Sequence, residues 1–174
     1  RGLGDVYKRQ AYSILGQIYV VLPLALLGVW GYKSDYQLFM NTEYLLMALF
    51  VFVWTNDTGA YIVGCTLGKH RLFERISPKK SWEGFFGGLA FCIILASLAN
   101  YIIPGMLSTA QWIGMGILTS IFSTWGDLCE SLLKRTAGVK DSGKILPGHG
   151  GILDRFDSEL IASPVIFIYL TFVL

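Results

Sequence analysis

The chain has 174 residues, of which 53% are hydrophobic and only 15% are charged. A soluble domain usually carries about 25% charged residues, so this composition argues against a soluble globular enzyme and excludes a disordered chain. The formal net charge of +2 is too small to indicate a nucleic-acid partner.

The first ten residues differ from the rest of the chain. The segment RGLGDVYKRQ is polar and non-periodic, so residues 1–10 are interpreted as a non-native leader and residues 11–174 as the membrane-embedded domain. The chain starts at Arg1 rather than Met, and it stops at Leu174 inside an apolar run. We therefore expect a fragment, truncated at both ends, that forms the C-terminal part of a larger bundle.

Apolar stretches follow one another along the remaining chain. A bilayer core of about 30 Å requires roughly 20 apolar residues per helix. Stretches of about this length cover residues 11–32, 43–64, 84–103, 110–129 and 160–174. The sequence predicts an all-α fold, a polytopic transmembrane bundle with about five spans in this chain.

Positive charge is concentrated in two connections between these stretches. Ten of the fourteen Lys and Arg residues lie there, namely Lys69, Arg71, Arg75, Lys79 and Lys80 before the third stretch, and Lys134, Arg135, Lys140, Lys144 and Arg155 before the fifth. Loops rich in Lys and Arg remain cytoplasmic. We expect both loops to form a site on the cytoplasmic face of a bacterial inner membrane.

Two aspartates interrupt the apolar stretches. Asp57 lies within WTNDTGAYIVG, and Asp127 lies within STWGDLCESLLKR. An ionisable residue in a membrane span is costly and is usually functional. The alternative for each is an interhelical hydrogen bond or a paired structural charge. On a helix, Glu130, Ser131 and Lys134 would share one face with Asp127.

The second basic loop combines glycines, cations and carboxylates. Backbone N–H groups of glycine-rich loops can hold phosphate oxygens, and Lys and Arg supply charge for a polyphosphate. Asp154 and Asp157 are three residues apart, so they can share a helix face that points at a cation. Positive-inside charge and attraction to anionic lipids would explain the Lys and Arg residues alone, but not the carboxylates among them. No Walker-type phosphate loop is present.

The segment from Ser131 to Asp157, SLLKRTAGVKDSGKILPGHGGILDRFD, resembles the signature of the phosphatidate cytidylyltransferase (CDP-diacylglycerol synthase) family. The family pattern has Ser, Lys-Arg, Lys-Asp, Pro-x-His-Gly-Gly and a closing Asp-Arg-x-Asp, and all are present here at the family's spacing. The segments NDTGAY and ISPKKSWEG resemble two further recurrent segments of the family. The resemblance covers about residues 40–174.

The resemblance implies transfer of a cytidylyl group from CTP to phosphatidate, which gives CDP-diacylglycerol and pyrophosphate. It also implies Mg²⁺ dependence, with a second cation left open, and a homodimer in the lipid bilayer. The metal ligands that it implies are Asp127 and Asp154. The catalytic residues that we expect are Lys134, Arg135, Lys140, His149 and Asp157. The substrate-binding residues that we expect are Lys79, Lys80, Ser81, Ser131, Gly150, Gly151 and Arg155.

Two other functions remain open at this point. Another CTP-using membrane enzyme, a polyprenol kinase or an ether-lipid cytidylyltransferase, would use the same metal and phosphate chemistry. A transporter could bind ions at Asp57 and Asp127, but it would require polar residues along several spans. The predicted charges gather instead at one membrane face, which favours a site at the membrane surface.

Overall fold

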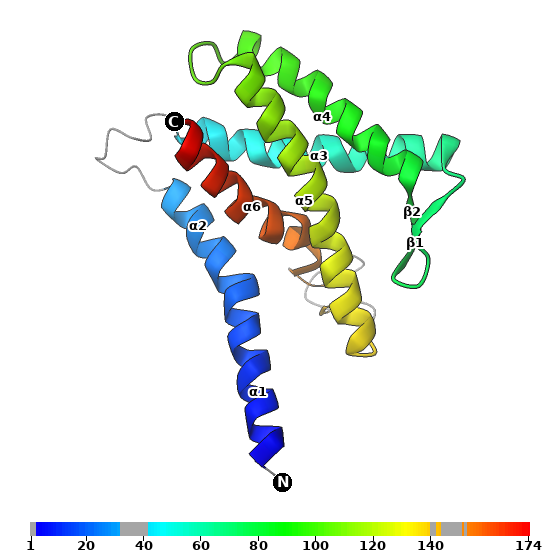
Figure 1. Cartoon of the computed structure of the whole chain (residues 1–174). Helices are drawn as coiled ribbons and strands as arrows, with labels where there is room; N and C mark the ends of the chain where they lie inside the picture. The colour runs from blue at the N-terminus through cyan, green and yellow to red at the C-terminus, as the bar shows by residue number, and fades with distance from the viewer. Residues whose placement is uncertain (1–2, 32–41, 140–141, 144–150, 152) are drawn as a thin grey trace.

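The structure is a computed structural model that describes residues 3–31, 42–139, 142–143, 151 and 153–174 (Figure 1). Most of the described chain is helical, which confirms the predicted all-α class. The elements in chain order are α1 (Leu3–Gly16), η1 (Gln17–Val21, a π-helical turn), α2 (Leu22–Gly31), α3 (Thr42–Leu67), β1 (Arg71–Phe73), β2 (Ser77–Ser81), α4 (Trp82–Ile102), α5 (Thr109–Thr136) and α6 (Leu153–Val173).

Three helices of the described chain are long and apolar enough to cross a membrane, Glu43–Leu67, Trp82–Ile102 and Leu153–Val173. This is fewer than the predicted five, although the chain is still an integral membrane helix bundle. The first predicted span reduces to a shorter apolar helix, Ser13–Val29. The fourth, α5, has 28 residues and is about 42 Å long. It is not among the three apolar helices because it contains several polar residues, which are buried against its neighbours.

Two predicted boundaries differ from the structure. Helix α1 begins at Leu3, so most of the segment interpreted as a leader is helical; its non-native origin stays a prediction. Helix α6 begins at Leu153 rather than near Leu160. Its first turn contains Asp154, and a carboxylate there interacts favourably with the helix dipole. Charged residues that the sequence placed in a loop therefore belong to the helix.

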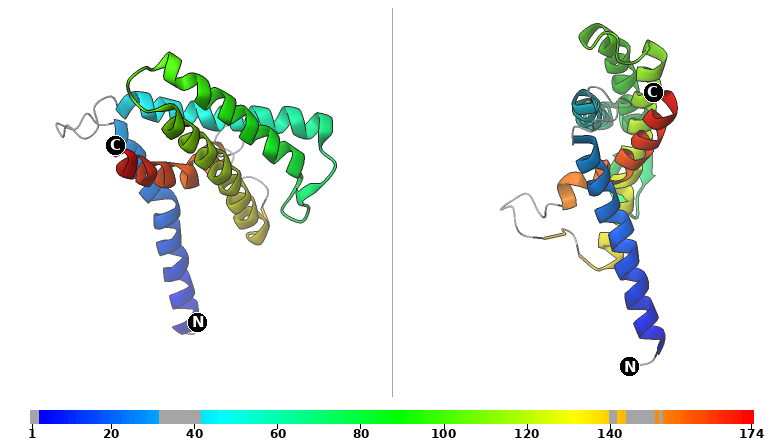
Figure 2. Two further views of the ribbon diagram at one scale, coloured as in Figure 1. Left: turned by 45° about the horizontal axis from the view of Figure 1, so that its top comes forward. Right: turned by 90° about the vertical axis from the view of Figure 1, so that its left-hand side faces the viewer.

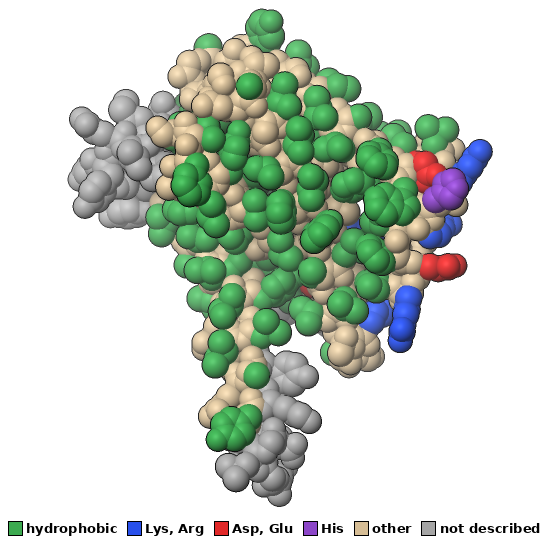
Figure 3. All heavy atoms as spheres, viewed as in Figure 1, with side chains coloured by type: hydrophobic (Ala, Val, Ile, Leu, Met, Phe, Trp, Pro, Cys, Tyr) green, Lys and Arg blue, Asp and Glu red, His purple; other side chains and the backbone are tan. Residues whose placement is uncertain are grey.

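Helices α3 and α4 form an antiparallel pair joined by the β1–β2 hairpin, and α5 packs against α4 and α6 (Figures 1 and 2). Helices α1 and α2 follow one another without a break; α2 packs against α6 and α3, and α1 projects from this body (Figure 2). On the face drawn in Figure 3, the charged side chains gather beside the hairpin, and hydrophobic side chains cover most of the rest. The bundle thus has one polar end.

A buried polar network joins α3 to α5 within the hydrophobic core. The Asn56 side chain is 1% exposed. Its Oδ1 accepts a hydrogen bond from Ser120 Oγ at 2.6 Å, and its Nδ2 donates to Ser123 Oγ at 3.1 Å. A Cβ atom added at Gly88 of α4 would lie 2.5 Å from Asn56 Oδ1. Glycine at this position therefore lets α4 pack directly over the network.

Candidate active site

A cavity of about 250 Å³ lies at the polar end, between α3, α4, α5 and the hairpin. Four charged side chains line it: Asp57 from α3, Lys79 and Lys80 from β2, and Asp127 from α5. The structure thus brings both intramembrane aspartates together with two lysines of the first basic loop. We call this cavity the polar pocket; its other lining residues are Asn56, Ala60, Tyr61, Leu72, Ser81, Gly84, Phe85 and Thr124.

The hairpin that carries the two lysines is fixed to the start of α4. The Ser81 side chain is the N-cap of α4 and accepts a hydrogen bond from Gly84 N at 3.1 Å. The Glu83 carboxylate accepts from the backbone N–H groups of Lys69 and His70, and it pairs with the His70 ring at 2.6 Å. These contacts hold both ends of the hairpin against one helix turn and so orient Lys79 and Lys80.

The lysine of the polar pocket that faces α5 is paired with an aspartate. Lys80 Nζ lies 2.6 Å from Asp127 Oδ2, and the two side chains are 26% and 33% exposed. Lys80 also donates to the Thr124 carbonyl at 3.4 Å. The other oxygen of Asp127 accepts a hydrogen bond from Ser131 Oγ at 3.3 Å. The pair is therefore open to a ligand in the pocket.

A second lysine, Lys134, lies near the end of α5 between two carboxylates. Its Nζ is 2.9 Å from Glu130 Oε2 and 2.8 Å from Asp154 Oδ1. Lys134 lies beyond the apolar part of α5. Burial disfavours its charged form, but the hydrogen bonds to Asp154 and Glu130 outweigh this effect and raise the pKa of Lys134 above its usual value. Lys134 is therefore a fixed cation.

The Asp154 carboxylate also orders the chain that leads into α6. It accepts hydrogen bonds from the backbone N–H groups of Ser142, at 3.0 Å, and Gly151, at 2.7 Å. Helix α5 ends at Thr136, and Gly138 follows its C-cap with a φ of +71°, a left-handed conformation that favours glycine. Asp154 thus connects α5, the following loop and α6, and both of its oxygens already accept hydrogen bonds.

Further carboxyl groups lie near Lys80 and Lys134. Glu130 is 1% exposed, and its Oε1 is buried without a hydrogen bond from any residue that the structure describes. Glu130 lies beside the carboxyl group of Asp157. Asp157 in turn lies within electrostatic range of Asp127 and Asp57. Carboxyl groups from α3, α5 and α6 thus lie near one another and near Lys80 and Lys134.

This donor set fits a hard cation. Among the described residues, no group of three or more His, Cys, Asp or Glu side chains is arranged to hold a metal ion. Mg²⁺ does not need such a cage, because it binds through one or two carboxylates together with substrate phosphates and water. The Asp127 side chain is 33% exposed in the polar pocket, and Asp157 lies near it. Asp154 is more fully engaged with protein groups.

The remaining predicted residues have different positions. Arg135 and Arg155 are exposed, near the end of α5 and at the start of α6. Gly151 is buried, and a Cβ atom there would collide with the Ser142 side chain. Lys140, His149 and Gly150, which the sequence placed at the site, lie outside the described residues.

Two residues of the site were not among the predicted catalytic, binding or metal residues. Asn56 lines the polar pocket and holds α3 to α5, and Glu130 neutralises Lys134. Both had a signal. Asn56 shares a helix face with the buried residues Leu49, Phe52 and Val53, and Glu130 lies one helix turn before Lys134. A polar residue on an apolar helix face requires a partner.

Comparison with known proteins identifies the family. Residues 4–173 match the sequence model of the cytidylyltransferase family. The chain is 40% identical, over 166 residues, to a protein of Staphylococcus aureus (strain COL) that is named phosphatidate cytidylyltransferase; the match covers 95% of this chain and 63% of that protein. Proteins of the same name from Staphylococcus haemolyticus and Staphylococcus epidermidis are 40% and 39% identical over 165 residues, with the same coverage.

The chain spans less than two thirds of the length of these curated relatives. The match to the family extends over nearly all of the chain and includes every helix that contributes to the polar pocket. The chain therefore belongs to the cytidylyltransferase family.

Proposed function

We propose that the protein transfers the cytidylyl group of CTP to phosphatidate at the polar pocket, which yields CDP-diacylglycerol and pyrophosphate. The observation that carries the proposal is the pocket itself, in which two lysines and two aspartates from three parts of the chain line one cavity at the polar end of the bundle. The family and the activity named for its relatives support the same reaction.

The proposed reaction needs charge neutralisation more than a base. A phosphate oxygen of phosphatidate, already ionised at neutral pH, forms a bond to the α-phosphorus of CTP. The bond from that phosphorus to the oxygen shared with the β-phosphate breaks, and pyrophosphate leaves with that oxygen. Both reactants are anions, so the barrier falls when cations surround the phosphates.

The lysines of the pocket supply part of this charge. Lys79 lines the pocket and is exposed, so it is available for a phosphate of either substrate. Lys80 is paired with Asp127. We propose that a phosphate takes over Lys80 when substrate binds, which frees a carboxylate oxygen of Asp127. Before substrate binds, the two charges of this pair would neutralise each other.

We also propose that Asp127 holds Mg²⁺, with Asp157 as a nearby carboxylate and Asp154 as the ligand that the resemblance implies. Bound Mg²⁺ would neutralise the phosphates and stabilise the pyrophosphate leaving group. Ser131 orients the Asp127 carboxylate through its hydrogen bond. Lys134 and Arg135 supply further positive charge near the end of α5.

The membrane position follows the same proposal. The polar end would face the cytoplasm of a bacterium, where CTP is found, because the basic residues gather there. The homodimer remains a proposal that rests on the resemblance.

Two differently labelled forms of CTP test the function directly. Membranes from cells that express the protein are incubated with phosphatidate, Mg²⁺, and CTP labelled at either the α- or the γ-phosphorus. We expect lipid-soluble label from α-labelled CTP only, and labelled pyrophosphate from γ-labelled CTP. The reaction should stop without added phosphatidate or after Mg²⁺ is chelated.

The same assay separates the alternatives. Transfer of the γ-label to lipid would identify a kinase and would refute the proposal. If label enters lipid with an ether-lipid acceptor but not with phosphatidate, the substrate is the ether lipid. Membranes from cells that carry the Asp127→Asn variant serve as the background control.

A further inference from the structure

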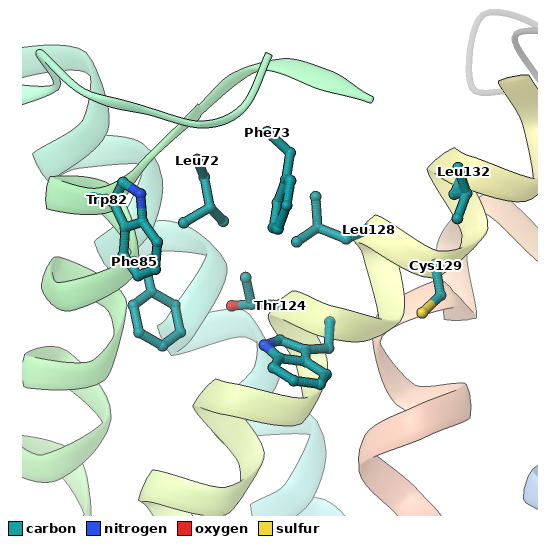
Figure 4. A pocket seen from close by; sticks show the side chains of 9 residues that line it. Leu72, Phe73, Trp82, Phe85, Thr124, Leu128, Cys129 and Leu132 are labelled. Atoms are coloured by element: carbon teal, nitrogen blue, oxygen red, sulfur yellow. The ribbon is translucent and has the colours of Figure 1, made fainter. Parts of the chain in front are cut away.

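An apolar groove adjoins the polar pocket. It has a volume of about 280 Å³ and lies between the hairpin, the first turns of α4, and α5 (Figure 4). No charged side chain is among its lining residues, which are Leu72, Phe73, Trp82, Phe85, Thr124, Trp125, Leu128, Cys129 and Leu132. In Figure 4, Leu72 and Phe73 lie on the hairpin side, opposite Leu128 on α5.

The groove and the polar pocket share a wall. Leu72, Phe85 and Thr124 line both cavities. A molecule could therefore occupy both at once, with a charged group beside Lys79 and Lys80 and an apolar group beyond Leu72. This division matches an anionic lipid, whose phosphate lies close to its hydrocarbon chains.

The outer residues of the groove are positioned to meet the bilayer. Phe73, Trp82, Trp125 and Leu132 each expose between 47% and 59% of their surface. The groove runs beside α4, whose apolar sequence is long enough to cross a membrane. In a membrane bundle, exposed apolar side chains face the hydrocarbon of the bilayer, so these residues would place the groove in contact with lipid chains.

We propose that this groove holds an acyl chain of the lipid substrate and that Phe73, Trp125 and Leu132 determine which chain lengths the protein accepts. The inference rests on the proposed function for the identity of the lipid, phosphatidate. The phosphate would lie at the lysines of the polar pocket, and the chain would pass over the shared wall into the groove.

Filling the groove tests this assignment by kinetics. Leu132→Trp adds a large ring at the rim. We expect kcat/KM for dioleoyl phosphatidate to fall about tenfold, the equivalent of about 1.4 kcal/mol or about two methylenes no longer buried. Dihexanoyl phosphatidate should react at the wild-type rate, because its chains are short, and the KM for CTP should not change.

A matched variant controls for general damage to the bundle. Val51 lines a separate apolar pocket between α3 and α4 that shares no residue with the groove. Val51→Trp should leave the ratio of kcat/KM for the two lipids unchanged. An equal loss on both lipids in Leu132→Trp, or the same chain-length effect in Val51→Trp, would overturn the assignment.

A chemical readout tests the groove without relying on turnover. Cys129 lines the groove, and Cys65 on α3 is an exposed thiol that lines neither cavity. In detergent micelles, dioleoyl phosphatidate should slow alkylation of Cys129 by N-ethylmaleimide several-fold, and dihexanoyl phosphatidate should not. Alkylation of Cys65, followed in the same sample by mass spectrometry, should not change.

The two experiments fail in different ways. If the protein makes no CDP-diacylglycerol but the long-chain lipid still protects Cys129, the proposed function fails and the groove still binds an acyl chain. The groove assignment is wrong if turnover is normal, Leu132→Trp leaves the ratio of kcat/KM for the two lipids unchanged, and dioleoyl phosphatidate does not protect Cys129. Resistance of Cys129 to alkylation without lipid would show that protein covers the groove, which also refutes it.

Discussion

The two lysine–aspartate pairs of the polar end have similar distances but different surroundings. Lys80 and Asp127 lie in an open pocket and are 26% and 33% exposed, whereas Lys134 and Asp154 are 17% and 12% exposed. Asp154 also accepts hydrogen bonds from the backbone N–H groups of Ser142 and Gly151. Ion-pair distance alone therefore does not separate a substrate site from a structural connection.

The two carboxylates differ in the contacts that each would lose if it bound a ligand. Asp127 would lose one lysine and a 3.3 Å hydrogen bond from Ser131 if it turned to a metal or a phosphate. Asp154 would lose contacts to two chain segments as well as to Lys134. We infer that the first pair serves the chemistry alone, whereas the second also maintains the geometry of the site, and three substitutions test this distinction.

Asp127→Asn should have the largest effect. Turnover should fall roughly 100-fold or more, about 2.7 kcal/mol, because a neutral amide neither holds a cation nor balances Lys80. The free energy of unfolding should change by less than about 1 kcal/mol, as is typical of partly exposed pairs. Labelled-CTP assays and thermal unfolding in detergent measure the two quantities. Glu43→Gln, at the start of α3, is the control and should alter neither; near-normal turnover in Asp127→Asn would remove Asp127 from the site.

Asp154→Asn should reduce stability as well as turnover. We expect the free energy of unfolding to fall by about 2 kcal/mol. This is less than the roughly 3–5 kcal/mol for an isolated buried pair, because Glu130 still neutralises Lys134. Thermal unfolding of the variant, compared with Glu74→Gln in the hairpin, measures the change. Lost turnover with wild-type stability would instead place Asp154 with Asp127 as a residue that acts on the substrates.

Ser131→Ala should have the smallest effect. It removes one hydrogen bond to Asp127, so turnover should fall about fivefold, or about 1 kcal/mol, with little change in stability. Thr136→Val removes a hydroxyl group one turn further along α5, where Thr136 bonds only to the carbonyl of Leu132 among the described residues. Thr136→Val should not change turnover in the same assay. A loss as large as that of Asp127→Asn would show that Ser131 contacts substrate itself.

The sequence was sufficient to predict the all-α membrane class and the end of the bundle that carries charge. Apolar length and the distribution of Lys and Arg depend on local composition, so they can be read from short windows. The start of α6 was misplaced because Asp154 and Arg155 look like loop residues until their partners are known. The hairpin was not predicted, because proline is disfavoured in most strands; Pro78 nevertheless lies within β2, a strand of a two-stranded ribbon that has a free edge.

The pairing of charges was less accessible from the sequence. Lys80 and Asp127 meet only because α4 packs on α5, which no local pattern records. Asp57 attracted attention because a charge in an apolar run is costly, yet the residue that holds the helices together is its neighbour Asn56. One residue corresponds to about 100° around a helix, which turns Asn56 inward and leaves Asp57 exposed at the pocket.

The Asn56 network has a consequence for how the protein is made. Asn56 and its partner Ser120 are separated by 64 residues, so a ribosome that adds about 5–20 residues per second completes the pair about 3–13 seconds after α3 emerges. During that interval α3 carries both an unsatisfied amide and Asp57 into the membrane. Stable insertion of α3 is therefore expected to depend on the arrival of α5, and truncation before Ser120 should leave α3 exposed to membrane proteases.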